Sequence, residues 1–424
     1  MVVADIMRGI LNYLFFRKNF MMIISKFEKP LESLLLLLLF ILFSGCATRP
    51  PALPEAYADK LPWGAIDLNI GKSGKYTLRD SLGSALIKKA NDHSKSNETV
   101  PFNVLTLSGG GTRGAFGAGL LSGWTDSGDI PEFDIVTGVS TGAVMATFVF
   151  LGGDELEKVK TFYTKMYTED IYTNSWLSFF GKAYLMDPEP LKKLFSNNFN
   201  EELLNRVADA HAKGRRLYIG TTNIDTGQLI VWDMGAIASS SRSDKYQRFS
   251  DIIYASSAIP IFLPPQYISV DVEDEQYYQM HVDGGIYSHV FMIGLLVNWG
   301  EILDFSDDAN INFDVTLYTI ANRKYRNRNA YDPVEQSPSS VISAYIETET
   351  DLLFDRSMYR LYDSCMQKGI KFRMAAVPMD VNHVDDATEF NPEKMLKLFN
   401  VGYSFGLNGV KWQDSISIDE YDNR

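Results

Sequence analysis

The chain of 424 residues is 46% apolar and 13% aromatic, which is enough to bury a large core and excludes a disordered protein. Its net charge of −13 argues against binding to nucleic acid and against electrostatic attraction to anionic lipid, so a contact with a membrane has to be apolar or covalent. Only two cysteines are present, Cys46 and Cys365, which excludes a disulfide-rich fold.

The first 45 residues have the pattern of a secretory signal. Ten apolar residues, 34–43, follow Lys26 and Lys29 and precede Ser44, Gly45 and Cys46. This run is too short to span a bilayer as a helix. The arrangement resembles a bacterial lipoprotein signal, which implies cleavage before Cys46, a lipid on Cys46 and a place in the bacterial cell envelope. An ordinary secretory signal and a buried helix remain the alternatives, and the start site stays open among three residues, Met1, Met21 and Met22.

Behind Cys46, prolines between residues 47 and 62 predict an extended tether, and residues 80–91 have weak helical spacing. Further along, strand patterns occupy 102–107, 133–137, 216–224, 229–232, 313–321 and 371–377. Helical patterns occupy 154–167, 201–213, 246–257, 341–362 and 392–406. This alternation predicts an α/β fold with a mostly parallel central sheet between helices.

Two strand-turn-helix units stand at the centre of the pattern. The second turn, residues 138–142, reads GVSTG and has the G-x-S-x-G form of a nucleophile elbow. Gly138 and Gly142 allow the strand and helix to pass closely, while Ser140 lies at the start of the helix, where backbone N–H groups favour negative charge. Ser140 is therefore the candidate nucleophile.

The first turn has a different character. Gly109, Gly110 and Gly111 allow N–H groups to converge on one point, Arg113 adds a cation, and Gly114 ends the loop. We interpret this loop as an oxyanion hole. A P-loop is excluded because no Gly-Lys-Ser/Thr follows, and a dinucleotide fingerprint is matched only loosely.

The segments SGGGTRG at 108–114, GVSTG at 138–142, ASSAIPIFLPP at 255–265 and Asp283-Gly284-Gly285 occur in this order. Together they resemble the patatin-like phospholipases from about Ser108 to Gly285. Ser108 departs from the family pattern, in which many members carry an acidic residue or glycine. The resemblance implies a patatin-like three-layer fold and a catalytic dyad of Ser140 and Asp283.

Asp283 also has a rationale in its own surroundings, because it follows an apolar segment and precedes two glycines at a strand end. A Ser140, Asp283 and His383 triad is the competing assignment, since these residues follow the order of an α/β-hydrolase. His281 and His289 flank Asp283, and we expect structural roles for both.

The predicted function is hydrolysis of ester bonds in phospholipids or related acyl lipids, without a cofactor or a metal. The apolar segments 176–180 and 259–265 are candidates for contact with acyl chains, and residues 168–188 are a candidate lid. A scaffold or lipid-binding lipoprotein on the same fold is the alternative. Oligomeric state stays open.

The predicted organisation has four parts. A signal peptide covers residues 1–45, and a lipid-anchored tether with an N-terminal extension covers 46–100. The catalytic domain covers 101–406, and an acidic tail covers 407–424. Cys365 lies in a helical pattern and is expected to be a buried structural thiol.

Overall fold

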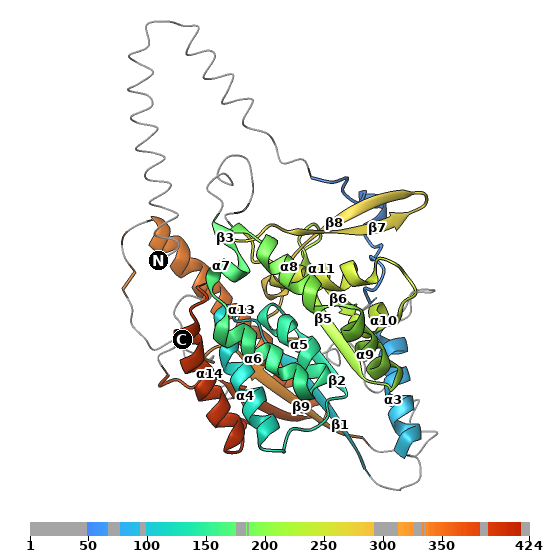
Figure 1. The fold of residues 1–424 in the computed structure, drawn as a ribbon. Coiled ribbons are helices and arrows are strands. Elements are labelled where there is room, and N and C mark those ends of the chain that lie inside the picture. Colours follow the sequence, from blue (N-terminus) through green and yellow to red (C-terminus); the bar gives the residue numbers. More distant parts are fainter. Residues whose placement is uncertain are drawn as a thin grey trace, which may run out of the picture.

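The computed structural model describes residues 49–66, 77–93, 99–174, 184, 186–291, 313–325, 333–334, 336, 338–381 and 389–416 (Figure 1). Several predictions therefore lie outside the described residues. They concern the signal segment, Cys46, the apolar segment 176–180 and His383.

The α-helices are α3 (Leu78–His93), α4 (Gly114–Asp126), α5 (Thr141–Leu151), α6 (Leu156–Lys165), α7 (Thr168–Ile171), α8 (Glu189–Asn198), α9 (Glu201–Ala212), α10 (Met234–Ser239), α11 (Lys245–Ser257), α13 (Pro338–Gln367) and α14 (Pro392–Leu407). The strands are β1 (Val100–Leu107), β2 (Ile135–Gly138), β3 (Thr173–Asn174), β4 (Met186–Asp187), β5 (Arg216–Asn223), β6 (Gln228–Asp233), β7 (Gln266–Val272), β8 (Glu275–Asp283), β9 (Phe313–Ala321) and β10 (Lys371–Ala376). Short 3₁₀ turns occupy Glu55–Tyr57, Gly111–Arg113, Gly153–Glu155 and Gly284–Ile286.

The central sheet has eight strands in the order β10-β9-β1-β2-β5-β8-β7, with β6 paired to β5. Strands β10, β9, β1, β2 and β5 are parallel, whereas β6, β8 and β7 join the sheet through antiparallel pairing. The predicted α/β fold with a mostly parallel sheet is confirmed. The antiparallel hairpin β7–β8 is an addition that the sequence patterns did not predict.

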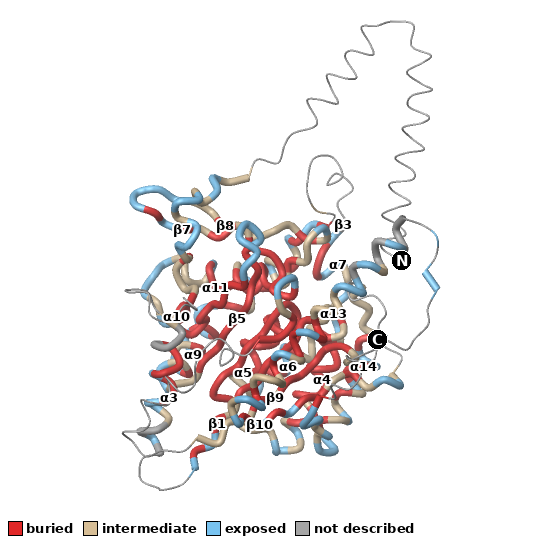
Figure 2. The backbone as a smooth tube through the Cα atoms, turned by 180° about the vertical axis from the view of Figure 1, so that it is seen from behind, coloured by how far each residue is buried: buried red, intermediate tan, exposed pale blue. Residues whose placement is uncertain are grey.

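Two apolar cores lie on the two faces of this sheet. Along β1, Leu105 and Leu107 pack with α4, α5 and α14, whereas Phe102 and Val104 pack with α3 and α13. This alternation is the two-residue period of a strand covered on both faces. Figure 2 shows the buried backbone gathered in the sheet and its adjoining helices. Cys365 of α13 is buried in the second core, as predicted.

Helices α4 and α14 touch backbone to backbone. A Cβ added at Gly119 would lie 2.0 Å from the carbonyl oxygen of Phe399, and one at Gly123 would lie 2.1 Å from that of Tyr403. Glycines on α14 meet α4 in the same way, since a Cβ at Gly402 would lie 2.1 Å from the carbonyl oxygen of Phe116. No larger residue fits at these crossing points, so α14 fixes the position of α4.

The predicted tether and acidic tail are partly docked on the body. Residues 49–66 run beside β8 and β6, where Ala52 bridges Tyr278 and Ala65 bridges Trp232. At the other end, residues 408–416 are folded back, and Gln413 exchanges two backbone hydrogen bonds of 2.8 Å with Met374 of β10. The first part of the predicted tail is therefore attached to an edge strand of the sheet through its backbone.

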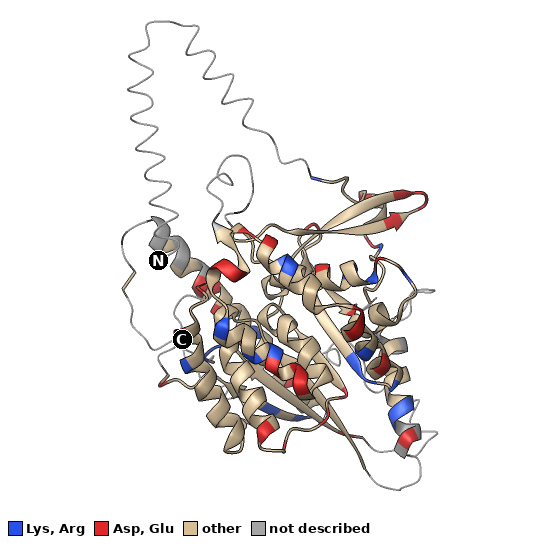
Figure 3. Ribbon diagram, in the orientation of Figure 1, with Lys and Arg blue, Asp and Glu red and all other residues tan. Residues whose placement is uncertain are grey.

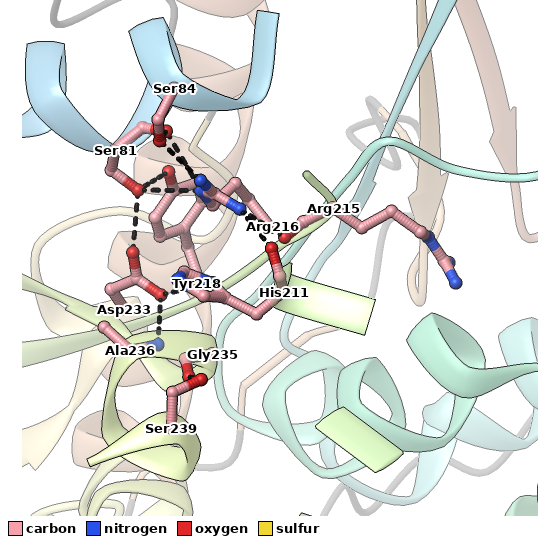
Figure 4. Close-up of polar contacts among 10 residues, drawn as sticks. All are labelled: Ser81, Ser84, His211, Arg215, Arg216, Tyr218, Asp233, Gly235, Ala236 and Ser239. Carbon is pink, nitrogen blue, oxygen red and sulfur yellow. Dashed lines mark hydrogen bonds and ion pairs between the residues drawn. The ribbon is translucent and has the colours of Figure 1, made fainter. Parts of the chain in front are cut away.

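Helix α3 belongs to the body as well, through a buried polar network (Figure 4). The hydroxyl of Ser81 donates to Asp233 at 2.7 Å, accepts from Nε of Arg216 at 3.2 Å and lies 2.6 Å from the Tyr218 hydroxyl. Ser81, Arg216 and Asp233 are all buried. Leu82 and Leu86 of α3 are also buried in the core beside β1.

Figure 3 marks the positions of the charged residues along the ribbon. A group of acidic residues marks the tip of the β7–β8 hairpin, namely Asp271, Glu273, Asp274 and Glu275. Within the described residues, no helix is both long and apolar enough to cross a membrane.

Candidate active site

Ser140 occupies a strained turn between β2 and α5. Its φ of 55° lies in the left-handed region, which side chains other than glycine rarely adopt, and such strain gathers at functional sites. A Cβ at Gly138 would lie 2.5 Å from the Gly142 carbonyl oxygen, and one at Gly142 would lie 2.2 Å from that of Leu107. The two glycines of the motif are thus required for the turn to close on itself and on β1.

Ser140 and Asp283 meet because two strands run head to head along one edge of β5. Strand β2 pairs with β5 up to Gly138 opposite Ile219, and β8 arrives from the other direction with Asp283 opposite Thr221. Strand β6 occupies the opposite edge of β5. The end of β8 therefore faces the turn that follows β2, although Asp283 ends an antiparallel strand and not a parallel one.

The carboxyl group of Asp283 is buried and accepts a hydrogen bond from Ser140. Burial raises its pKa to about 6, against the opposing effects of the hydrogen bonds from Ser140 and from the N–H of Gly285, the latter at 2.7 Å. A carboxylate with this pKa is a stronger base than an exposed aspartate and is still ionised at neutral pH.

The glycine-rich loop passes directly beside Ser140, but one of its donors is already in use. The N–H of Gly109 donates to the carbonyl of His289 at 3.3 Å. Of the three predicted donors, Gly109 therefore has its N–H engaged within the protein. Gly114 has a packing role, since a Cβ there would lie 2.7 Å from both Thr141 and Tyr163.

The position of this loop is set by a residue that the sequence analysis missed. Asn322, directly after β9, donates from its backbone N–H to the Ser108 hydroxyl at 2.8 Å and from Nδ2 to the Ser108 carbonyl at 2.9 Å. Its Oδ1 accepts from the N–H of Gly117 at 3.1 Å. A Cβ at Gly110 would lie 2.5 Å from the Asn322 carbonyl oxygen. Asn322 thus holds the loop at its start, its middle and the helix behind it.

The sequence did contain a signal for Asn322, because it is a polar residue directly after the strand predicted at 313–321, which pairs with β1. The departure at Ser108 is also explained. Its hydroxyl accepts from Asn322 and donates to the Gly109 carbonyl at 2.8 Å, so it joins the strand end to the loop.

Ser256 supports the elbow from the last turn of α11. Its hydroxyl accepts from the backbone N–H of Ser140 at 3.0 Å and donates to the Gly220 carbonyl at 2.7 Å. The segment 255–265 was singled out in the sequence, but this hydrogen bond across the elbow could not be read from it.

Two of the five histidines lie near Asp283 and are buried. His281 has polar partners on both sides, with Nδ1 2.9 Å from the Thr221 hydroxyl and Nε2 3.3 Å from Gln279. His289 has no hydrogen-bond partner for Nδ1, and its ring meets Phe354 edge to face. Burial lowers the pKa of each imidazole to about 3, so both are neutral.

Arg113, the cation of the glycine-rich loop, lies beside α13. Arg113 lies 3.6 Å from the carboxylate of Glu347, and its side chain is largely buried. This contact joins the glycine-rich loop to α13. Within the described part of the chain, no cluster of three or more His, Cys, Asp or Glu residues is arranged to hold a metal ion.

A small cavity of about 60 Å³ borders Ser140. Its walls are mostly apolar and include Ile259, Phe262 and Leu263, so the segment 259–265 reaches the site as predicted. Gly111 and Thr141 line the same cavity. An acyl group is the kind of substrate fragment that suits these walls.

Comparison with known proteins bears on this site. Residues 105–295 match the family described as patatin-like phospholipase. Patatin-12 of Solanum tuberosum is 24% identical over 200 residues, which cover 43% of this chain and 49% of Patatin-12. Patatin group D-3 of the same organism is 23% identical over the same shares of the two chains. The chain thus spans about half the length of the curated relatives it matches.

Among solved structures, VipD from Legionella pneumophila is similar with a TM-score of 0.36 and 12% identity, covering 72% of this chain and 66% of VipD. The resemblance to the patatin-like phospholipases is confirmed for residues 105–295 by the family match.

Proposed function

Since residues 105–295 match the patatin-like phospholipases, we propose that this chain is a serine acyl hydrolase that cleaves ester bonds of phospholipids or related acyl lipids. The observation that carries the proposal is the hydrogen bond from Ser140, held in a strained turn, to the buried carboxyl group of Asp283. The adjoining apolar cavity supports an acyl substrate.

In the proposed reaction, Asp283 takes the proton of Ser140 while Oγ attacks the ester carbonyl carbon. The N–H groups of Gly110 and Gly111 bind the oxyanion of the tetrahedral intermediate. Asp283 then returns the proton to the leaving alcohol, and the acyl group stays on Ser140. Asp283 next takes a proton from water, which attacks the acyl-enzyme, and returns that proton to Oγ of Ser140 as the acyl–oxygen bond breaks and the fatty acid is released.

The pKa of about 6 suits both proton transfers. The carboxylate is ionised at neutral pH and can accept a proton, and the acid form is not so weak that it fails to return one. His289 and His281, with pKa values lowered to about 3, are weaker bases than Asp283 and do not compete with it for the proton.

The test compares hydrolysis of a short-chain reporter ester and of phospholipid vesicles by wild type, Ser140→Ala and Asp283→Asn. We expect both variants to be inactive and folded, while the exposed controls Ser196→Ala and Asp274→Asn keep wild-type activity. A folded but inactive His383→Ala would replace the dyad by the triad. A wild type that hydrolyses neither substrate would overturn the proposal and favour the scaffold.

The proposal includes a membrane anchor through lipidated Cys46 in the bacterial envelope, supported by the signal pattern at 26–46. Full-length chain and Cys46→Ser, produced in a bacterial host, are compared by detergent partition and by mass spectrometry of the mature N-terminus. Wild type should carry acyl groups and enter the detergent phase, and the variant should not. Equal partition of the two without acyl mass would contradict the anchor.

A further inference from the structure

A second cavity lies behind the small one that borders Ser140. It has a volume of about 260 Å³, is partly open to solvent and is lined by residues of α5, α6 and α8, whose places in the fold are labelled in Figure 1. Phe148, Leu194 and Phe199 contribute to its largely apolar wall. This cavity is larger than the ~150 Å³ at which an apolar cavity already binds benzene.

The two cavities share a wall of three side chains. Val144, Phe162 and Phe195 line both of them, and these residues come from α5, α6 and α8 respectively. Val144 lies on the first turns of the helix that begins directly after Ser140. A chain that passes these three side chains therefore moves from the site of bond cleavage into the larger cavity.

Size distinguishes the two spaces. The cavity at Ser140, about 60 Å³, holds only the first carbons of an acyl group, whereas the one beyond the wall, about 260 Å³, has room for a longer chain. Its outer end is bordered by the long side chains of Glu157 and Lys158. Lys158 forms an ion pair with Glu155 at 2.8 Å, which leaves its methylenes to cover apolar surface.

We propose that the cavity lined by α5, α6 and α8 binds the distal part of a long acyl chain, and that Val144, Phe162 and Phe195 form the passage to it. The proposal rests on the function proposed above and makes long-chain acyl esters the preferred substrate class. Short esters need only the small cavity, and their hydrolysis does not depend on the larger one.

The test fills the larger cavity from its rim. Asn198→Trp and Thr161→Trp place an indole at half-buried positions that line this cavity and not the one at Ser140. Ser196→Trp is the matched control, because Ser196 is exposed on the same helix as Asn198 and lines neither cavity. Hydrolysis of p-nitrophenyl butyrate, octanoate, laurate and palmitate is measured for each protein.

We expect both cavity variants to hydrolyse butyrate at the wild-type rate and to show a KM for laurate and palmitate raised about tenfold, or ~1.4 kcal/mol of binding free energy. Ser196→Trp should match wild type on all four esters. If the KM values of the cavity variants equal those of wild type at every chain length, the inference is overturned. Hydrolysis of butyrate in that case still supports the proposed function.

A binding measurement separates the two proposals when the wild type is inactive. Palmitate is added to Ser140→Ala and to Ser140→Ala combined with Asn198→Trp, and the thermal midpoint is followed. Stabilisation of the first protein and not of the second supports the cavity as an acyl site. Equal stabilisation of both, or of neither, overturns it.

Discussion

The two halves of β5 border buried polar clusters of opposite character. Near its first residue, the hydroxyl of Ser81 connects Arg216, Tyr218 and Asp233, and nearly every polar atom there has a partner within the protein. Opposite its second half, Asp283 is buried with a pKa raised to about 6.

The Asp283 cluster also contains His289, whose Nδ1 has no partner, and Ser140 in a strained turn. Hydrogen bonds that close on themselves stabilise a fold, whereas buried groups with shifted pKa values or open partners are typical of reactive sites. The difference teaches that burial alone does not mark a site.

The largest effect on stability is expected when the closed cluster loses its central hydroxyl. Ser81→Ala removes a partner from Arg216, Tyr218 and Asp233 at once, so we expect the free energy of unfolding to fall by about 3 kcal/mol. Urea unfolding measures it, and ester hydrolysis by the folded variant should be unchanged. Ser84→Ala is the control, since its more exposed hydroxyl accepts from Nη2 of Arg216 and donates to the Ser81 carbonyl at the rim of the cluster, and this variant should lose less than 1 kcal/mol, or about a third as much. If Ser81→Ala and Ser84→Ala lost the same free energy of unfolding, Ser81 would not be the centre of the buried cluster.

At Asn322, which holds the glycine-rich loop, we expect a substitution to lower activity rather than stability. Asn322→Ala leaves the Ser108 carbonyl and the Gly117 N–H without their partner, so the loop donors move. We expect kcat to fall about 100-fold, the loss typical of one oxyanion donor, with KM nearly unchanged. Asn103→Ala, which removes a half-buried asparagine of β1, is the control. A raised KM at constant kcat would show that Asn322 affects substrate binding and not the oxyanion.

Substitution of Asp283 should abolish activity and, at the same time, increase stability. Because the folded-state pKa is raised, the stabilising contribution of this carboxyl is complete below pH 4 and is lost as pH rises through 6. Asp283→Asn is therefore expected to be inactive and, at pH 8, more stable than wild type by about 2 kcal/mol. The gain should vanish near pH 4 in thermal unfolding. A variant less stable than wild type at pH 8 would mean that the carboxylate contributes structure.

The smallest expected effect sharpens the assignment of the base. The ionised form of Asp283 accepts the proton, so kcat/KM on a soluble ester should fall about tenfold between pH 7 and pH 5 and stay level above pH 7. Ser81→Ala should show the same profile. An activity that is constant down to pH 5 would exclude Asp283 as the base with this pKa.

Much of this architecture was predictable because it is encoded locally. The elbow at Ser140 and the strand at 313–321 follow from motif and periodicity, and each agrees with the structure. Local patterns also placed α14 within one residue of its observed end at Leu407.

The sequence motifs predicted that Ser140 and Asp283 act together, but they did not predict how the fold brings the two residues into contact. Its cause, two strands running toward each other along β5, is a property of sheet pairing that no local pattern contains. The same holds for the loss of the Gly109 donor to His289, since a carbonyl acceptor far along the chain has no side-chain signature.

The backbone contact between α4 and α14 has a consequence for the order of events during synthesis. The glycine-rich loop leads directly into α4, and α4 is fixed by glycines that meet Phe399 and Tyr403 on the last helix of the described chain. A nascent polypeptide therefore carries its serine long before the loop beside it can adopt its final shape. If the proposed hydrolase function holds, we therefore expect a chain that ends before Pro392 to lack ester hydrolysis, although it contains both Ser140 and Asp283.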